Sequence, residues 1–109
     1  MTEREKKWYS VFMSTIHIPE EKNNYTYILL CADGSFYCGW TNNLVRRLHA
    51  HNAGIGAKYT RSRLPVELVW YAISDTKEEA MSLEARIKHL TRRQKEKLVR
   101  GEADPFYLP

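Results

Sequence analysis

The sequence predicts a small α/β domain in which a three-stranded, mostly antiparallel sheet is flanked by helices. Two runs of aromatic and aliphatic residues, 25–31 and 35–40, are separated by a short turn, which is typical of a β-hairpin. A third run at 66–72 predicts another strand, and apolar residues at helical spacing follow residues 42 and 76. The expected order is therefore β-β-α-β-α-α.

The length of the hairpin turn decides which side chains share a face of the sheet. A two-residue Asp33-Gly34 loop would place Tyr27 and Tyr37 on opposite faces, because side chains alternate along a strand. A three-residue loop, with Gly34 in the left-handed conformation, pairs Leu29 with Tyr37 and puts both tyrosines on one face. If the two tyrosines serve one site, we expect the three-residue loop.

The first predicted helix follows the hairpin directly. Asn42 or Asn43 can cap its start, and Gly54 marks its expected end. Arg47 and His51 are then four residues apart on this helix. Side chains at this spacing are neighbours on one helical face, so the two residues are expected to lie side by side.

Length and motif positions restrict the protein to one domain. A chain of 109 residues suffices for one hydrophobic core. We assign residues 25–100 to the domain, residues 1–24 to an N-terminal extension that could dock a protein partner, and residues 101–109 to a C-terminal tail. Capping-box patterns at 76–79 and 91–94 predict where the two later helices begin.

The charge of the chain is modest in sum but clustered in sequence. It has 17 Lys and Arg residues against 13 Asp and Glu residues, a formal net charge of +4. Residues 42–63 contain five basic side chains and no acid, and residues 86–100 contain seven basic side chains with Glu96 as the one acid. Such clusters are typical of a surface that binds a polyanion, although the solvated faces of two helices would give the same pattern.

The cysteine count and the hydropathy indicate the compartment. Cys31 and Cys38 are too few for a disulfide-stabilised secreted fold. No segment reaches the roughly 20 apolar residues that a membrane-spanning helix needs. We therefore expect a soluble cytoplasmic protein that does not contact a membrane.

Several short motifs in a fixed order point to a particular family. They are Tyr27-Ile28-Leu29, Cys31-Ala32-Asp33-Gly34-Ser35, Tyr37-Cys38-Gly39, Arg46-Arg47-Leu48, His51-Asn52-Ala53-Gly54, Gly56-Ala57-Lys58-Tyr59-Thr60-Arg61 and Ile87-Lys88. Together they resemble the GIY-YIG nuclease family, and more closely its small single-domain bacterial members of unassigned role. The resemblance covers roughly residues 25–100 and implies a metal-dependent endonuclease.

The resemblance implies a role for each of five residues. Tyr27 and Tyr37 match the tyrosines of the family's two motifs, and Arg47 matches the arginine on the next helix. Glu84 matches the single glutamate that binds the metal, expected to be Mg²⁺ or Mn²⁺. His51 falls where family members have a histidine or a tyrosine.

The chemistry of phosphodiester hydrolysis fits these residue types. A cation held by Glu84 alone would keep most of its ligand positions for water and phosphate, as Mg²⁺ prefers. Arg47 can donate paired hydrogen bonds to a phosphate, which a lysine cannot copy. The proton of the attacking water could pass to Tyr27, Tyr37 or His51, of which only the histidine has an unperturbed pKa near neutrality.

Each of these assignments also has an ordinary structural alternative. Tyrosines in strands usually serve packing. Glu84 could form an ion pair with Lys88, four residues further along the helix. His51 could interact with the dipole at the end of its helix.

The residues around the expected site are basic or aromatic. Arg46, Lys58, Arg61 and Arg63 are expected to bind nucleic-acid phosphates. Trp40 stands where the repair nucleases of the family have a lysine; it would either weaken phosphate activation or offer a surface for base stacking.

Two glycines are expected to have structural roles, and one motif departs from the family pattern. Gly34 would allow the hairpin turn, and Gly39 closes the second tyrosine motif. The first motif has Tyr25-Thr26 where the family name has Gly-Ile.

We therefore expect an endonuclease that cuts structured, branched or damaged DNA, in DNA repair, with DNA rather than RNA as its substrate. The alternative is a non-catalytic nucleic-acid-binding module of the same fold, used in DNA repair or RNA metabolism. A third hypothesis is an interaction domain in which residues 1–24 dock another protein.

Overall fold

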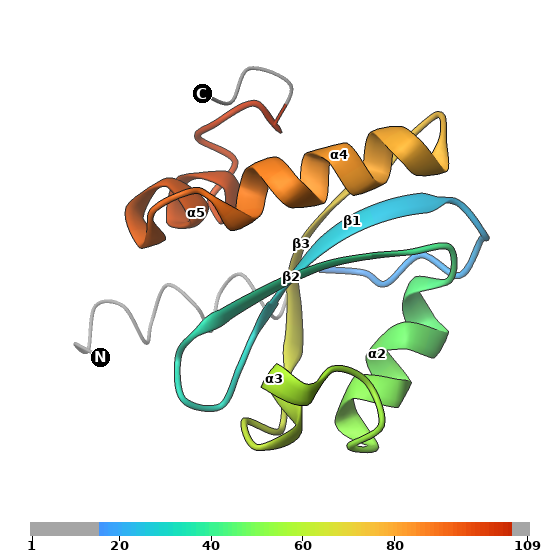
Figure 1. The fold of residues 1–109 in the computed structure, drawn as a ribbon, viewed down its shortest axis with the longest axis vertical. Coiled ribbons are helices and arrows are strands. Elements are labelled where there is room, and N and C mark those ends of the chain that lie inside the picture. Colours follow the sequence, from blue (N-terminus) through green and yellow to red (C-terminus); the bar gives the residue numbers. More distant parts are fainter. Residues whose placement is uncertain (1–15, 106–109) are drawn as a thin grey trace.

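The computed structural model describes residues 16–105. They form one three-stranded antiparallel sheet, with the strand order β2-β1-β3, and helices cover both of its faces (Figure 1). The predicted order is confirmed, and a one-turn helix, α3, which was not predicted, is added between the first predicted helix and the third strand. The elements are β1 (Asn24–Leu30), β2 (Phe36–Thr41), α2 (Leu44–Asn52), α3 (Lys58–Arg61), β3 (Glu67–Ser74), α4 (Lys77–Lys88) and α5 (Arg92–Val99).

The hairpin between β1 and β2 has the three-residue loop that the shared site required. The Cys31 amide donates to the Ser35 carbonyl at 2.8 Å, and Gly34 has a φ of 84°. Leu29 pairs with Tyr37 across the two strands, as predicted. Tyr27 and Tyr37 therefore point to the same face of the sheet.

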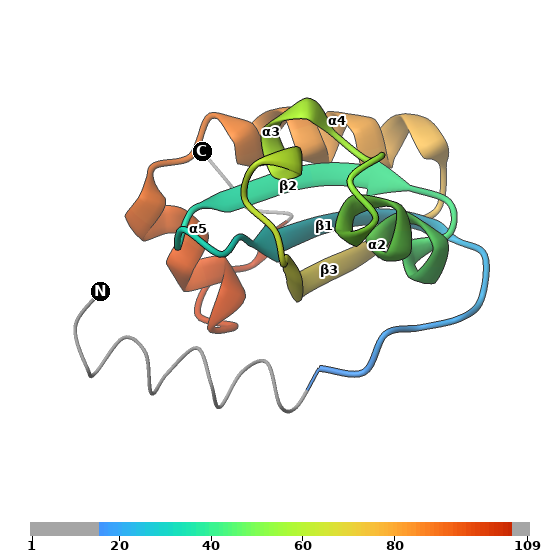
Figure 2. The same cartoon turned by 90° about the horizontal axis from the view of Figure 1, so that it is seen from below.

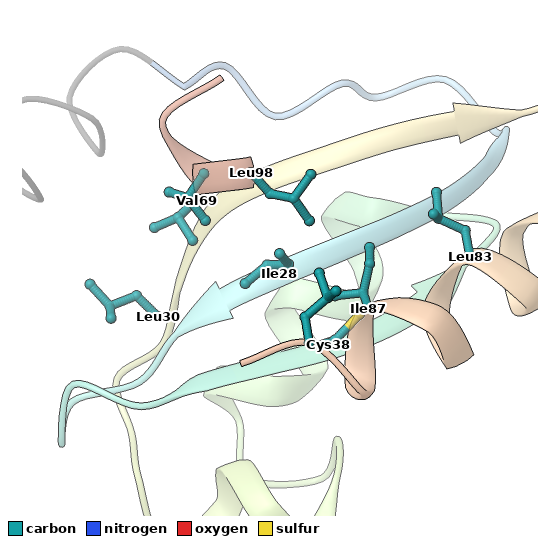
Figure 3. Close-up of a cluster of buried hydrophobic side chains, with 9 residues drawn as sticks. Ile28, Leu30, Cys38, Val69, Leu83, Ile87 and Leu98 are labelled. Atoms are coloured by element: carbon teal, nitrogen blue, oxygen red, sulfur yellow. The ribbon is translucent and has the colours of Figure 1, made fainter. Parts of the chain in front are cut away.

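The sheet separates two hydrophobic layers. On one face, α4 and α5 pack against alternate residues of the strands (Figure 3). On the other face, α2 packs against the remaining residues of β1 and β3 through Leu44, and the two tyrosines lie in this second layer. The first layer includes Ile28, Leu30, Cys38, Val69, Leu83, Ile87 and Leu98.

The starts of the two C-terminal helices differ in detail. Thr91 and Gln94 form a complete capping box, with each side chain bonded to the other residue's backbone N–H. Thr76 accepts from the Glu79 amide at 3.1 Å, but the Glu79 carboxylate accepts from Asp75 rather than from Thr76. The capping box predicted at 76–79 is therefore only half formed, because the carboxylate reaches one residue further back.

The described residues include parts of both expected terminal segments. Residues 16–23 lead into β1 and run back past β3 in Figure 2, and Ile16 and Ile18 pack against the layer that contains the tyrosines. Residues 1–15 of the expected extension and 106–109 of the expected tail lie outside the described residues. Within 16–105, no helix has both the length and the apolar character needed to cross a membrane.

Candidate active site

Helix α2 brings two of the predicted residues to the sheet. Asn43 caps its start by accepting a hydrogen bond from the Arg46 amide at 3.0 Å. Leu44 and His51 are buried, so this face of α2 lies against the sheet. Arg47, one turn before His51, is half-buried on the same side.

Tyr27 is the centre of the candidate site. Its hydroxyl oxygen Oη lies 2.9 Å from Nε2 of His51, and both side chains are buried, with 1% and 0% of their surface exposed. Nε of Arg47 donates to the same oxygen at 3.4 Å, a long hydrogen bond. The phenol of Tyr27 therefore lies between a guanidinium and an imidazole.

Two glycines make room for this pair. A Cβ atom on Gly39 would lie 2.6 Å from Oη and 2.7 Å from Cζ of Tyr27, which is the cross-strand partner of Gly39. A Cβ atom on Gly56 would lie 2.6 Å from Nδ1 of His51 and 2.8 Å from its Cα. Any larger residue at position 39 or 56 would therefore displace a site side chain or the backbone of α2.

The second nitrogen of His51 is bound by α3. Its Nδ1 lies 2.9 Å from Oγ1 of Thr60, a fully buried residue. The Thr60 hydroxyl in turn donates to the carbonyl of Ala57 at 3.0 Å. No role for Gly56 or Thr60 could be predicted from sequence, because a helix of four residues is too short to show a hydrophobic period.

Tyr37 extends the site toward the surface. Its ring meets His51 edge-on, with 5.3 Å between the ring centroids, and stacks on Tyr59 at 6.0 Å. The Arg63 guanidinium lies 3.9 Å from the Tyr59 ring centroid, and its Nε donates to Oδ2 of Asp33 at 3.0 Å. Arg63 thus ties the end of α3 to the hairpin turn. The contact of Tyr59 with Tyr37 was not predicted from sequence either.

Burial sets the protonation of the central pair. Burial raises the pKa of Tyr27 to about 12, although the hydrogen bond and charge of Arg47 act in the opposite direction. Burial, and secondly the charge of Arg47, lower the pKa of His51 to about 4. The hydrogen bond to Tyr27 is the main cause that raises the pKa of Arg47. At neutral pH the phenol and the imidazole are therefore both neutral.

Glu84 lies in the other layer of the molecule. It belongs to α4, which packs on the Cys38 face of the sheet, and Oε1 of Glu84 is 3.8 Å from Nζ of Lys88. Burial raises the pKa of Cys38 to about 12, and the next cause is the charge of Glu84, which places this carboxylate near β2. The structure thus brings Tyr27, Tyr37, Arg47 and His51 together, and places Glu84 on the other side of the edge strand β2.

The donor set of Glu84 suits a hard cation. Its side chain is 20% exposed, so it is not closed off from solvent. Within residues 16–105, no group of three or more His, Cys, Asp or Glu side chains could hold a metal ion. A single partly exposed carboxylate fits an ion of the Mg²⁺ type, which keeps several waters, and does not fit a closed Zn²⁺ site.

Trp40 does not share the face of the tyrosines. It pairs with Thr26 across the strands, and the Thr26 hydroxyl donates to the Ala80 carbonyl of α4. Nζ of Lys77, in the first turn of α4, lies 5.3 Å from the centroid of the Trp40 ring. Trp40 therefore faces the α4 layer.

The predicted phosphate-binding cations lie on the side of α2 and α3. Arg46 on α2 and Lys58 and Arg61 on α3 are exposed. Arg63 is half-buried, and its ion pair with Asp33 and its contact with Tyr59 engage its guanidinium. Arg46, Lys58 and Arg61 are thus more accessible to a phosphate than Arg63.

This arrangement defines the class of the protein. The chain matches the family described as the GIY-YIG catalytic domain over residues 23–97, and it belongs to that family. The family is one of nucleases, whose members generally bind nucleic acid.

Within that class, the chain is similar to bacterial relatives named UPF0213 proteins. It is 55% identical to one from Clostridium perfringens over 80 residues, covering 73% of this chain and 86% of the relative. It is 50% identical to one from Halalkalibacterium halodurans over 84 residues, covering 77% and 89%. The solution NMR structure of an E. faecalis protein, 45% identical, matches with a TM-score of 0.54 over 77% of this chain and 90% of that chain.

Proposed function

We propose that the protein is a metal-dependent endonuclease that hydrolyses phosphodiester bonds in structured, branched or damaged DNA. The observation that carries this proposal is the group of Tyr27, Tyr37, Arg47 and His51, which converges from β1, β2 and α2 in a domain of a nuclease family. Packing alone would not require a cation to hydrogen-bond a buried tyrosine.

Arg47 is the residue that would bind the reacting phosphate. Its guanidinium is always charged and offers a planar fork of donors, which matches two phosphate oxygens. The hydrogen bond from its Nε to Tyr27 holds the guanidinium beside the phenol. A phosphate on Arg47 would therefore lie close to Oη of Tyr27.

Tyr27 would take the proton of the attacking water. Both ring nitrogens of His51 are already engaged, Nε2 by Tyr27 and Nδ1 by Thr60, so its imidazole lies behind the phenol of Tyr27. Tyr27 contacts both His51 and Arg47, so its oxygen can receive a proton while its own proton moves to Nε2 of His51. This assignment favours Tyr27 over direct action of His51 as the base.

Glu84 would hold Mg²⁺ or Mn²⁺ at the other side of β2. Because β2 is an edge strand, a substrate strand that lies along it would be reached by Arg47 from one layer and by Glu84 from the other. When bound, the ion would supply charge stabilisation to the leaving oxygen. The ion pair between Glu84 and Lys88 is long and partly exposed, so an incoming cation could replace Lys88 at low cost.

The size of the domain favours structured DNA as the substrate. A module of this size offers a small binding surface, and phosphate contacts of the kind Arg46, Lys58 and Arg61 would make carry no sequence information. We infer that the shape of a flap, branch or lesion selects the cleaved bond.

The test is a cleavage assay on labelled single-stranded, duplex, flap and branched DNA and RNA, with Mg²⁺ or Mn²⁺ and with EDTA. Arg47→Ala and Glu84→Ala are expected to lose cleavage by at least about 100-fold while keeping most of their DNA affinity. Arg86→Ala and Glu78→Ala, which change exposed residues of α4, are the matched controls and should cut normally. Equal cleavage by all variants, or cleavage in EDTA, would refute the assignment.

Trp40 favours a second candidate function, a nucleic-acid-binding module without hydrolysis. Trp40 stands where the repair nucleases of the family have a lysine, and its ring lies in the α4 layer against Lys77. For such a module, Glu84→Ala would leave DNA binding unchanged or tighten it, because it removes a negative charge. DNA binding by the wild-type protein without cleavage in any metal would select this candidate.

A further inference from the structure

The hydrogen bonds behind Tyr27 and His51 run on to two further groups, the Thr60 hydroxyl and the Ala57 carbonyl, that none of the assigned roles uses. We propose that Thr60 is a positioning residue that holds His51 in the Nδ1–H tautomer, so that Tyr27 donates its hydrogen to His51 and keeps a lone pair for the proton of the attacking water. The catalytic part of this proposal rests on the nuclease function proposed above.

The direction of these hydrogen bonds is fixed first at their inner end, the Ala57 carbonyl. The Ala57 carbonyl can only accept, and the Thr60 hydroxyl lies 3.0 Å from it. A hydroxyl has one hydrogen, so a Thr60 that donates to Ala57 must accept from its other neighbour, Nδ1 of His51, at 2.9 Å. Nδ1 then carries the hydrogen, and Nε2 of neutral His51 is an acceptor.

The outer end of these hydrogen bonds is compatible with the same direction. Arg47 can only donate, and its Nε lies 3.4 Å from Oη of Tyr27. Tyr27 therefore accepts from Arg47, and its one hydrogen is available for Nε2 of His51 at 2.9 Å once that nitrogen is an acceptor. In the opposite tautomer, Tyr27 would accept from both neighbours, and Thr60 would give up its bond to Ala57. The acceptor-only carbonyl of Ala57 thus selects the arrangement through Thr60, and the donor-only guanidinium of Arg47 is satisfied in it.

Burial keeps solvent from reversing these bonds. Tyr27, His51 and Thr60 are 1%, 0% and 0% exposed. Gly56 lets the backbone close against the ring of His51, where any Cβ atom would collide with Nδ1. Among the described residues, every buried side-chain nitrogen and oxygen has a hydrogen-bond partner. A tautomer change would break at least one of these bonds, which is costly without water to replace it.

The proposed step is a displacement at phosphorus that is coupled to two proton transfers. The oxygen of the attacking water forms a bond to phosphorus while the bond from phosphorus to the leaving oxygen breaks. The proton of the water passes to Oη of Tyr27, and the proton of Tyr27 passes to Nε2 of His51, giving an imidazolium that still donates from Nδ1 to Thr60. The leaving oxygen takes a proton from solvent water. His51 then returns its extra proton through Tyr27 to the hydroxide so formed.

Substrate binding would make His51 a better acceptor. The groups that face its ring are Tyr27 from β1, Tyr37 from β2, Arg47 from α2 and Thr60 from α3. The positive charge of Arg47 is the second cause of the low pKa of His51, after burial. A phosphate bound to Arg47 would offset that charge and raise the proton affinity of His51 only when substrate is present.

The first test needs no substrate. The ¹⁵N spectrum of the imidazoles in the purified protein, with His51 assigned by comparison with His51→Gln, reports which ring nitrogen carries hydrogen. We expect Nδ1–H in the wild type and in Thr60→Ser, which keeps the hydroxyl. Thr60→Val has nearly the same shape but no acceptor, so it should shift His51 toward the Nε2–H tautomer. An Nε2–H tautomer in the wild type, or an unchanged one in Thr60→Val, would overturn the proposal.

A second variant covers the case in which Thr60→Val does not fold. Tyr27→Phe removes the hydroxyl on the other side of His51 and leaves Thr60 in place. Because Thr60 sets the tautomer in this proposal, His51 should remain Nδ1–H in Tyr27→Phe. A change to Nε2–H there would show that Tyr27 sets the tautomer, and would overturn the role of Thr60.

The catalytic consequence is tested on folded variants by steady-state cleavage. Thr60→Val should lower kcat by about 100-fold with little change in KM, and Thr60→Ser should restore most of it. A KM effect alone, or a normal kcat, would contradict the positioning role even if the tautomer is as proposed. Absence of cleavage in the wild type would instead refute the proposed nuclease, while the ¹⁵N spectra would still decide the role of Thr60.

Discussion

At the scale of single residues, the candidate site depends on two side chains, His51 and Tyr27, that burial keeps neutral. His51 is an imidazole whose charged form is disfavoured by burial and by Arg47. Tyr27 is a phenol whose ionised form is disfavoured by burial. Each therefore makes a well-defined hydrogen bond, and neither adds a charge to the interior.

The low pKa of His51 predicts how stability depends on pH. The unfolded chain binds a proton at this histidine near its ordinary pKa of 6.5, whereas the folded protein binds it only near pH 4. The free energy of unfolding should therefore fall as the pH falls from about 6.5 to 4, by at most about 3 kcal/mol. Urea unfolding across this range, with the wild type compared with His51→Gln, isolates this effect. Parallel pH profiles for the two proteins would contradict it.

The sequence allowed part of this site to be predicted. Tyr27, Tyr37, Arg47 and His51 lie in motifs with recognisable spacing, and the structure does bring them together. Thr60 could not be assigned from sequence, because its role depends on a hydrogen bond to a residue of another helix.

At the scale of secondary-structure elements, the hairpin is the part that sequence reasoning predicted best. The condition that Tyr27 and Tyr37 share a face selected the three-residue loop, and the observed register confirms it. Helix α3 was not predicted, since its four residues carry no periodic pattern. The reach of Glu79 to Asp75 depends on a rotamer that the sequence does not specify.

The contact between Gly39 and Tyr27 predicts a coupling between neighbouring strands. Gly39→Ala would place Cβ 2.6 Å from Oη of Tyr27, so the ring must move, and we expect a loss of about 2 kcal/mol in stability. In the Tyr27→Ala background the same substitution should cost little, because the opposing ring is gone. Chemical denaturation of the two single variants and the double variant measures this coupling. Equal costs in both backgrounds would contradict the steric explanation.

At the scale of the whole molecule, the sheet divides the proposed machinery between two layers. Arg47 and the tyrosines lie on the α2 side, and Glu84 lies on the α4 side. The edge strand β2 is therefore where both could reach one substrate strand. No sequence pattern predicts this division, because it follows from which helix covers which face.

The exposed cations beside α2 and α3 predict how DNA binding depends on salt. Lys58→Ala and Arg61→Ala should each weaken binding and reduce the slope of log affinity against log salt by about 1. Arg86→Ala is the control, since Arg86 lies beside Ser74 and Glu79 at another part of the surface. Fluorescence anisotropy with flap DNA over a series of salt concentrations measures the slopes. Unchanged slopes for both α3 variants would place the DNA elsewhere.

The most direct test of the central claim is single-turnover cleavage of flap DNA in Mn²⁺, with DNA affinity measured on the same samples. The account predicts that the wild type binds and cuts, whereas Arg47→Ala binds but cuts at least about 100-fold more slowly. Binding by both proteins with no cleavage by either, or equal cleavage by both, would contradict the assignment of this site to phosphodiester hydrolysis.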